Sequence, residues 1–337
     1  MTVDLSYTVE HNADILEWTC MTNSTGYLSW TDVIRNLNAF SKGEATTTYG
    51  EPDAEYITWK GDPITWNGGP LTWSGSNTAS VPPSTEIFET IVDEWIESLS
   101  DRAQACGSKN AYPFDISKYG LSFRKCSSPA YQFQLLVSFN NHSRGNIGAN
   151  EAPAHKLFEE LSAAAAGQYL GDSKTSIAFG FPRSSFPKGF REAVNCLAEL
   201  LGEGEACRDR QGLQEAKDDK LDVVAWKEFP DRKASKLILF GQCAIGQHWS
   251  RKVNELQPEK WCKRNFIELP AVNPIPAFFV PRTLSERDAE EAGIDQILLD
   301  RCRISSLCSG LLDDQLEKRL WNWIRTTLLD NGQERTL

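Results

Sequence analysis

The chain has 337 residues, of which 40% are hydrophobic and 24% charged, and its formal net charge is −11 at neutral pH. This length allows two domains of ordinary size, and the composition is typical of a globular protein and not of a disordered one. The acidic balance argues against a protein that binds nucleic acid over its whole surface. Any such contact would have to come from a local basic patch or from a basic partner.

The sequence also bears on the compartment of the protein. No apolar run approaches the length of a membrane-spanning helix, and the first residues lack the basic-then-apolar form of a signal peptide. The nine cysteines are scattered without a C-x-x-C pair, and the four histidines show no ligand spacing, so neither a zinc ribbon nor a zinc hydrolase is expected. We therefore expect a cytoplasmic protein with reduced thiols and no membrane association.

Hydrophobic periodicity predicts a mixed α and β arrangement in the N-terminal half. The alternation of residues 131–139 predicts a half-buried strand, paired in a hairpin with residues 121–124. Segments with helical periodicity or helix-capping residues are 12–18, 30–37, 84–99 and 154–166.

A short repeat interrupts this half. Thr58-Trp59, Thr65-Trp66 and Thr72-Trp73 recur every seven residues, and the Pro and Gly within the units exclude a coiled coil. One interpretation is that the tryptophans form an aromatic surface that binds a partner or stacks on bases. The second is that they cover the domain's own core. The second interpretation is favoured because bare tryptophans are costly in water.

A boundary near residues 168–183 divides the chain into an N-terminal domain, residues 1–175, and a C-terminal domain, residues 176–337. In the second domain an amphipathic helix over residues 190–201 ends at Gly202. Residues 247–256 are predicted to form a helix halted at Pro258. Further predicted elements are strands at 175–181, 277–280 and 297–299 and a last helix at 313–328.

Two short apolar runs of the C-terminal domain each carry one polar side chain at a fixed place. Asp222 lies inside the run 221–226, and Gln242 ends the run 236–242. A buried apolar strand has little reason to hold an aspartate unless its carboxylate is paired or binds a cation. Adjacent strands that present a carboxylate and an amide oxygen at one edge offer the hard ligands that Mg²⁺ prefers. The sequence therefore predicts a metal site suited to phosphodiester cleavage.

This order of elements, with these residues, resembles the PD-(D/E)XK nuclease superfamily and most closely its Mrr-type restriction endonuclease branch, over roughly residues 185–307. The resemblance implies an α/β protein: a C-terminal, restriction-endonuclease-like mixed sheet flanked by helices, with an N-terminal α+β domain for specificity or assembly. Asp222 matches the aspartate strand, and Gln242 matches the glutamine that this branch uses in place of glutamate. Glu192 or Glu199 would supply the helix carboxylate.

The resemblance also implies roles. Asp222 would bind Mg²⁺ or Mn²⁺, Gln242 would be a second, neutral ligand, and the helix glutamate would hold the attacking water. The motif lysine is missing, because Ala244 stands at its place. Lys252 is our candidate for the displaced amine, with Arg251 and His248 behind it. The alternative is that Lys252 is an ordinary solvated lysine.

The function implied by this resemblance is a metal-dependent endonuclease of a prokaryotic restriction or anti-phage system. Its expected partners are double-stranded DNA and an ATPase protein. The sequence leaves open whether the protein forms a homodimer and whether its substrate is DNA or RNA. The basic cluster of Lys260, Lys263 and Arg264 either contacts phosphate or is a solvated surface. The alternative function is a catalytically inactive, nuclease-fold binding protein that holds a partner through its Trp-rich region.

Overall fold

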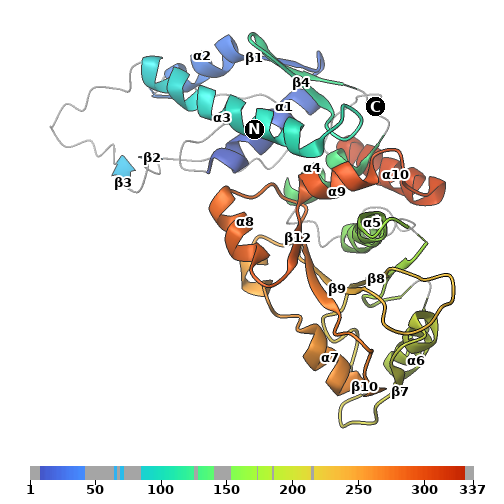
Figure 1. Ribbon diagram of the computed structural model, residues 1–337. Coiled ribbons are helices and arrows are strands. Elements are labelled where there is room, and N and C mark those ends of the chain that lie inside the picture. Colours follow the sequence, from blue (N-terminus) through green and yellow to red (C-terminus); the bar gives the residue numbers. More distant parts are fainter. Residues whose placement is uncertain are drawn as a thin grey trace. The chain divides into compact units, whose positions relative to one another are not determined.

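The computed structural model describes residues 8–41, 64–66, 69–71, 85–124, 128–139, 153–172, 174–183, 186–213 and 216–330 (Figure 1). The chain divides into two compact units. The first comprises Met1–Gln104, Pro113–Lys125 and Arg335–Leu337, and the second comprises Ala105–Tyr112 and Cys126–Glu334. The second unit therefore takes in helices before residue 175 that a boundary at 175/176 assigns to the N-terminal domain.

The first unit combines helices with a small antiparallel sheet. Its sheet has the order β1-β5-β4, so β5 forms its hairpin with β4. The side chain of Thr8 caps the first helix by accepting a hydrogen bond from the backbone N–H of His11. The elements are α1 (Val9–Thr22), β1 (Tyr27–Ser29), α2 (Trp30–Ser41), α3 (Thr85–Cys106), β4 (Phe114–Ser117) and β5 (Gly120–Phe123). They confirm the three helices predicted before residue 100.

The Thr-Trp repeat is described only in part. Trp66 ends the short strand β2 (Ile64–Trp66), which pairs antiparallel with β3 (Gly69–Leu71). Trp59 and Trp73 lie outside the described residues, and so does the side chain of Trp66. Both interpretations of the repeat therefore stay predictions.

The strand predicted over residues 131–139 is wrong, because this segment forms the helix α4 (Ala130–Phe139). Residues 130–138 are buried all round the helix, so no solvent-exposed face gives the sequence a helical period. Two of the polar residues that produce the alternation, Gln134 and Ser138, donate hydrogen bonds inside the core. Gln134 Nε2, for example, donates to Ala130 O and to Ser305 Oγ, each at 3.1 Å.

The second unit is built on a mixed five-stranded sheet with the order β12-β11-β9-β8-β6. The neighbours β6 and β8, and β8 and β9, pair antiparallel. The neighbours β9 and β11, and β11 and β12, pair parallel. The strands are β6 (Ser176–Ala178), β8 (Val223–Trp226), β9 (Ile238–Cys243), β11 (Ile275–Phe279) and β12 (Ile297–Leu299). All four residues of β8 are buried, as expected for a strand covered on both faces.

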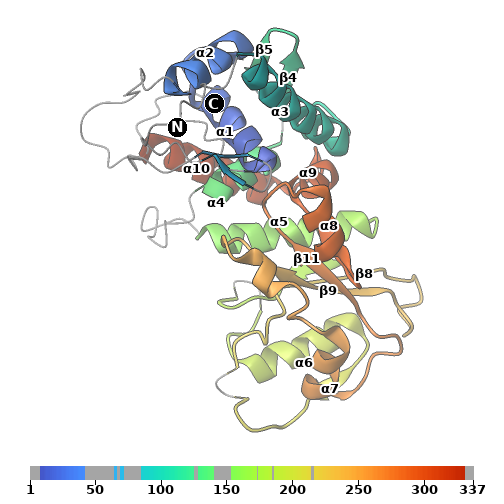
Figure 2. The ribbon, with the colours of Figure 1, turned by 90° about the vertical axis from the view of Figure 1, so that its left-hand side faces the viewer.

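Helices cover the two faces of this sheet. The helix α5 (Ala154–Tyr169) packs on β6, β8 and β9 from one side, and α6 (Phe190–Leu201) and α7 (Pro258–Asn265) lie on the other (Figure 2). The core on the α6 and α7 side is aromatic, with edge-to-face contacts that join Phe179, Phe190, Phe240, Phe266 and Trp261.

The helix α6 belongs to an insertion. It lies between β6 and β8, which are neighbours in the sheet, and it ends at Gly202, whose φ of 61° closes the helix in the left-handed conformation. After α6 the chain forms β7 (Glu205–Cys207), which pairs antiparallel with β10 (Phe266–Glu268). The remaining helices are α8 (Glu286–Gly293), α9 (Arg301–Cys308) and α10 (Asp314–Asp330).

The helix predicted over residues 247–256 is also corrected. Only a 3₁₀ turn, η1 (Trp249–Lys252), forms there. Pro258 does not halt a helix but begins α7, since a proline at the first helical position loses no hydrogen bond. Among the described helices, none has both the length and the apolar character needed to cross a bilayer.

Candidate functional site

Asp222 is held at the start of β8 by contacts to two other strands. Its backbone N–H donates to Gly241 O at 2.9 Å, and its carbonyl accepts from Phe179 N at 2.7 Å and from Gly180 N at 3.1 Å. Its carboxyl Oδ2 accepts a hydrogen bond from Cys243 N at 2.8 Å. These contacts fix both the backbone and one carboxyl oxygen, while Oδ1 faces Gly180.

A second carboxyl, that of Glu159 on α5, meets Asp222 at this place. A Cβ atom added to Gly180 would lie 2.4 Å from Glu159 Oε2 and 3.0 Å from Asp222 Oδ1. Any residue other than glycine would therefore fill the space on which the two carboxyls converge. The absence of a side chain at Gly180 leaves a small, oxygen-lined space beside the end of β6.

Both carboxyls have raised pKa values. The pKa of Glu159 is raised to about 8, mainly by burial and then by the charge of Asp222, while the hydrogen bond and charge of Lys156 oppose the shift. Burial likewise raises the pKa of Asp222 to about 7, although the hydrogen bond from Cys243 N opposes it. Two carboxyls that are costly to ionise together are the arrangement that a bound cation relieves.

An amine enters the site from the same helix. Lys156 Nζ lies 2.5 Å from Glu159 Oε2, and the side chains are only 12% and 9% exposed. The positive charge of Lys156 also lowers the pKa of Asp222. Lys156 therefore lies within electrostatic reach of both carboxyls.

Gln242 occupies the neighbouring strand. The pairing of Val223 with Gly241 places Gln242 beside Asp222. Gln242 is 5% exposed, and its Nε2 donates to Glu255 Oε2 at 3.3 Å. Within the part of the chain that the structure describes, its Oε1 is buried without a hydrogen-bond partner. A buried amide oxygen without a partner is rare and is available as a ligand.

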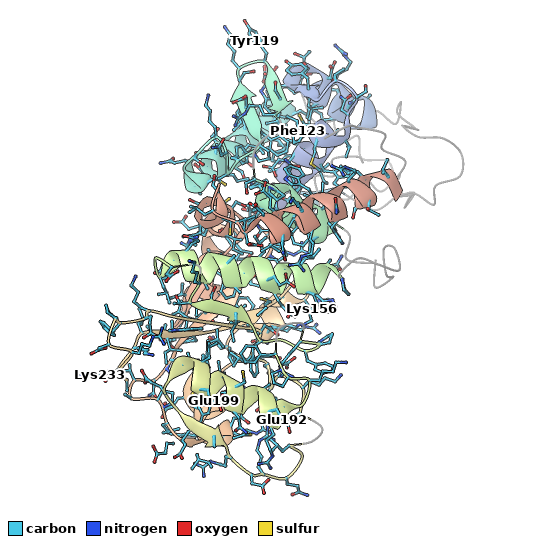
Figure 3. The ribbon with its side chains drawn as sticks, turned by 90° about the vertical axis from the view of Figure 1, so that its right-hand side faces the viewer. Tyr119, Phe123, Lys156, Glu192, Glu199 and Lys233 are labelled. Atoms are coloured by element: carbon cyan, nitrogen blue, oxygen red, sulfur yellow. The ribbon has the colours of Figure 1, made fainter. Side chains whose placement is uncertain are left out.

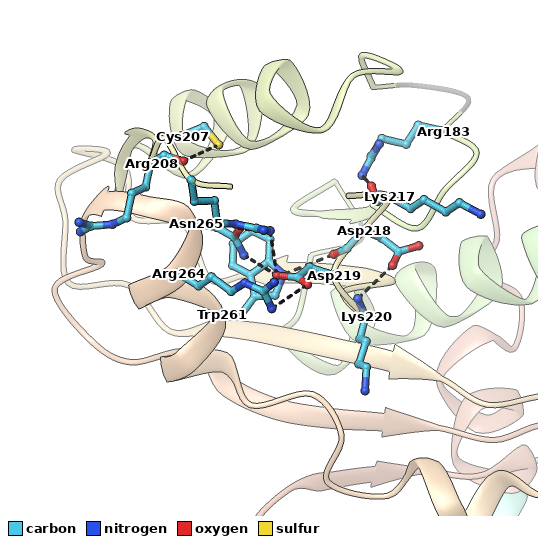
Figure 4. Close-up of polar contacts among 11 residues, drawn as sticks. Arg183, Cys207, Arg208, Lys217, Asp218, Asp219, Lys220, Trp261, Arg264 and Asn265 are labelled. Carbon is cyan, nitrogen blue, oxygen red and sulfur yellow. Dashed lines mark hydrogen bonds and ion pairs between the residues drawn. The ribbon is translucent and has the colours of Figure 1, made fainter. Parts of the chain in front are cut away.

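The loop that leads into Asp222 is tightly anchored (Figure 4). Asp219 and Lys220 both have left-handed backbones, with φ of 56° and 72°, which cost energy in residues other than glycine. Arg264 Nη1 lies 3.3 Å from Asp219 Oδ1, and Trp261 Nε1 donates to Asp218 O at 3.3 Å. Such strain persists where surrounding contacts fix the backbone, and it often accompanies functional sites.

The same contacts bear on the predicted basic cluster. Arg264 pairs with Asp219, and Lys263 pairs with Glu259 on the preceding turn of α7. Both charges are therefore already matched by acids of this chain. Lys260 is exposed.

The structure brings two of the predicted site residues together and separates two others. Asp222 and Gln242 lie side by side, as expected. Glu192 and Glu199 are exposed on α6, on the opposite side of the sheet from Lys156 (Figure 3), so neither reaches Asp222.

The carboxyl that meets Asp222 belongs to α5 and not to the predicted helix α6. Because α6 is inserted between β6 and β8, the helix before the Asp strand in sequence covers the face of the sheet opposite α5. The predicted range of α5 contained Lys156 and Glu159. The signal in the sequence was this pair of opposite charges, three residues apart in a helix rich in alanine.

The two candidate lysine positions, Ala244 and Lys252, have different surroundings in the structure. Ala244, where the resemblance implies a lysine, is fully buried and packs with Phe278, Val280 and Leu298. Lys252 ends η1 and is exposed, although its charge lowers the pKa of Asp222. Lys252 is thus near the site but solvated, whereas Lys156 is enclosed in it.

The donor set can be tested for its fit to a metal ion. Within the described ranges, no group of three or more His, Cys, Asp or Glu side chains could hold one. The site instead offers two carboxyls, Glu159 and Asp222, and the amide of Gln242. All three donate oxygen, which suits a hard cation such as Mg²⁺ or Mn²⁺. The space over Gly180, lined by one oxygen of each carboxyl, fits such an ion, and Gln242 lies on the adjacent strand.

Comparison of the chain with protein-family models, with curated proteins and with solved structures gives no match in any of the three.

Proposed function

We propose that this protein is a Mg²⁺- or Mn²⁺-dependent endonuclease of the PD-(D/E)XK type that acts on DNA. The observation that carries the proposal is the convergence of the Glu159 and Asp222 carboxyls on the space over Gly180, with Gln242 on the adjacent strand. The chain order α5, β6, β8, β9 and then the parallel strand β11 supports it. The resemblance implies such an order: a helix with a glutamate, the Asp strand and then the Gln strand.

Each residue of the site would have a role in cleavage that follows from its chemistry. Asp222, Glu159 and Gln242 would hold the cation through oxygen atoms. When bound, the cation would polarise the phosphoryl oxygen and lower the pKa of the attacking water. Lys156 would supply the positive charge that the family places at the position of Ala244, and so would stabilise the negative charge that develops on the phosphate. In this proposal Lys156 replaces Lys252 as the displaced amine.

Local positive charge can reconcile DNA binding with an acidic chain. The exposed Lys252 acts electrostatically on Asp222, and the exposed Lys217 lies on the loop that leads into it, although the chain carries a net charge of −11. Local lysines of this kind contact the phosphate backbone without making the whole surface basic. Lys156 and Lys220 also lie in this region, each paired with an acid, Glu159 and Glu255 respectively. A role in prokaryotic restriction or anti-phage defence, a cytoplasmic location and an ATPase partner rest on the resemblance.

Incubation of the pure protein with supercoiled plasmid tests the proposal. We expect nicked and linear products with Mg²⁺ or Mn²⁺, and none with EDTA or with the Asp222→Asn or Glu159→Gln protein. A protein that binds DNA without cutting it in either metal, and whose melting temperature neither metal raises, would support the alternative of an inactive binding protein.

A further inference from the structure

An exposed aromatic ring stands at the rim of the candidate site. Phe181 follows Gly180 directly in the chain and is 38% exposed. Its backbone N–H donates to Asp218 Oδ2 at 3.2 Å, which ties it to the loop that leads into Asp222. One exposed ring is ordinary on a protein surface. The position of this one, next to the space where two buried carboxyls meet, is not.

The ring is flanked by positive charge and held in place. Lys217 Nζ and the Arg183 guanidinium carbon each lie 5.9 Å from the centroid of the Phe181 ring. Arg183 is buried, lies 4.6 Å from the Phe179 ring and donates to the backbone oxygen of Lys188. It also donates to the backbone oxygen of Lys217 (Figure 4). The guanidinium thus links the Phe181 segment to the loop carrying Lys217.

We propose that Phe181 is a stacking platform for an unpaired base of the strand whose phosphate lies at the Glu159–Asp222 pair. The inference rests on the proposed nuclease function and narrows its substrate to single-stranded or locally opened nucleic acid. An aromatic face stacks on any base. In the proposed complex the Lys217 ammonium, which lies over the Phe181 ring in the free protein, moves off the ring to a flanking phosphate. In an intact duplex each base is already stacked on its neighbours and offers no free face.

The chain contains a matched control. Phe229 is 49% exposed and lies beyond the other end of β8. Its backbone N–H donates to Glu228 Oε1, so its surroundings include an acid. Among the described residues, no cation lies over its ring. Phe229→Ala therefore removes the same exposed ring without touching the proposed platform.

Binding is measured in the full chain carrying Asp222→Asn, so that cleavage does not consume the probe. The probes are a fluorescein-labelled single strand, the blunt duplex of the same sequence, and a single strand with one 2-aminopurine, whose fluorescence reports stacking. We expect Phe181→Ala to weaken single-strand binding about tenfold or more and to abolish the 2-aminopurine quenching. Duplex binding should be unchanged, Phe181→Trp should retain the affinity, and Phe229→Ala should behave as the parent.

Three results would overturn the platform: an unchanged Phe181→Ala affinity, an equal loss on single strand and duplex, or a Phe181→Trp protein as weak as Phe181→Ala. Phe181→Leu keeps an apolar side chain without a π-face, so a folded Leu protein that binds like the parent also overturns it. Cleavage by the wild-type chain separates the two proposals. If binding depends on Phe181 but the wild-type chain shows no metal-dependent cleavage, the stacking platform stands and the nuclease function is wrong. If the chain cleaves but binding does not depend on Phe181, the nuclease function stands and the platform is wrong.

Discussion

Lys156 Nζ and Glu159 Oε2 form a 2.5 Å ion pair across one turn of α5, with both side chains almost buried. A buried pair holds each charge in place, because the loss of one partner leaves the other uncompensated in a medium of low dielectric constant. One turn of a helix thus brings to the site both a second carboxyl and an amine. Ala244, where the resemblance implies an amine, is closed by core packing.

The first prediction compares the two candidate lysines. Lys156→Ala should reduce the single-turnover cleavage rate by about a hundredfold or more, because it removes an enclosed charge that stabilises the transition state. Lys252→Ala, the matched control, should have a small effect because its ammonium is solvated. The fold is checked by melting at pH 6, where Glu159 is protonated and needs no partner. The opposite ranking of the two variants would remove Lys156 from the mechanism.

The second prediction concerns Asp222→Asn. The asparagine oxygen can still accept the hydrogen bond from Cys243 N, so the protein should fold, and the loss of a buried carboxyl should leave its stability equal or higher at pH 8. Metal-dependent cleavage should be lost. A titration with Mn²⁺ should raise the melting temperature of the wild type but not of the variant. An equal rise in both proteins would place the metal elsewhere.

The third prediction is a pH dependence of stability. The pKa of Glu159 rises from 4.5 to about 8 on folding, so between these values the folded protein binds more protons than the unfolded one. The free energy of unfolding should therefore fall as the pH rises through this window. Asp222 acts in the same direction up to about pH 7. Glu159→Gln should flatten the curve and melt higher than wild type at pH 8 but not at pH 5. A steeper curve for the variant would contradict the raised pKa.

The fourth prediction tests the space over Gly180. Gly180→Ala puts a methyl group 2.4 Å from Glu159 Oε2, so the two carboxyls must separate. Cleavage and metal-induced stabilisation should both be lost, with overpacking costing about 1 to 3 kcal/mol of stability. Gly246→Ala is the matched control, since its Cβ would meet nothing within 4 Å. Full activity of the Gly180→Ala protein would show that the space is not used.

Much of the fold could be predicted because its signals are local. The amphipathic stripe and Gly202 predicted α6 to its last residue, and the apolar runs predicted β8 and β9. The error at α4 has a physical cause: a helix buried on every side carries no period of 3.6 residues. The missed start of α7 came from a proline that can end one helix or begin another.

The candidate site could be predicted only in the part that local sequence determines. A carboxylate in the apolar run of β8 and an amide ending β9 indicated Asp222 and Gln242. Glu159 could not be placed in this way, because only the packing of the folded chain shows that α5, and not α6, brings a carboxyl to Asp222. That packing is tertiary, and the inserted α6 offered Glu192 and Glu199 as closer candidates along the chain.

The insertion between β6 and β8 also bears on when the site can exist. During synthesis Lys156, Glu159 and Gly180 leave the ribosome before Asp222, and Gln242 follows only after the whole of α6 and β7. A nascent chain that ends before Ile238 therefore has the helix with its ion pair but neither the amide of Gln242 nor the N–H of Cys243 that holds Asp222. A product that terminates before Ile238 therefore lacks the assembled site, and any ligand of this site requires a chain that extends through β9.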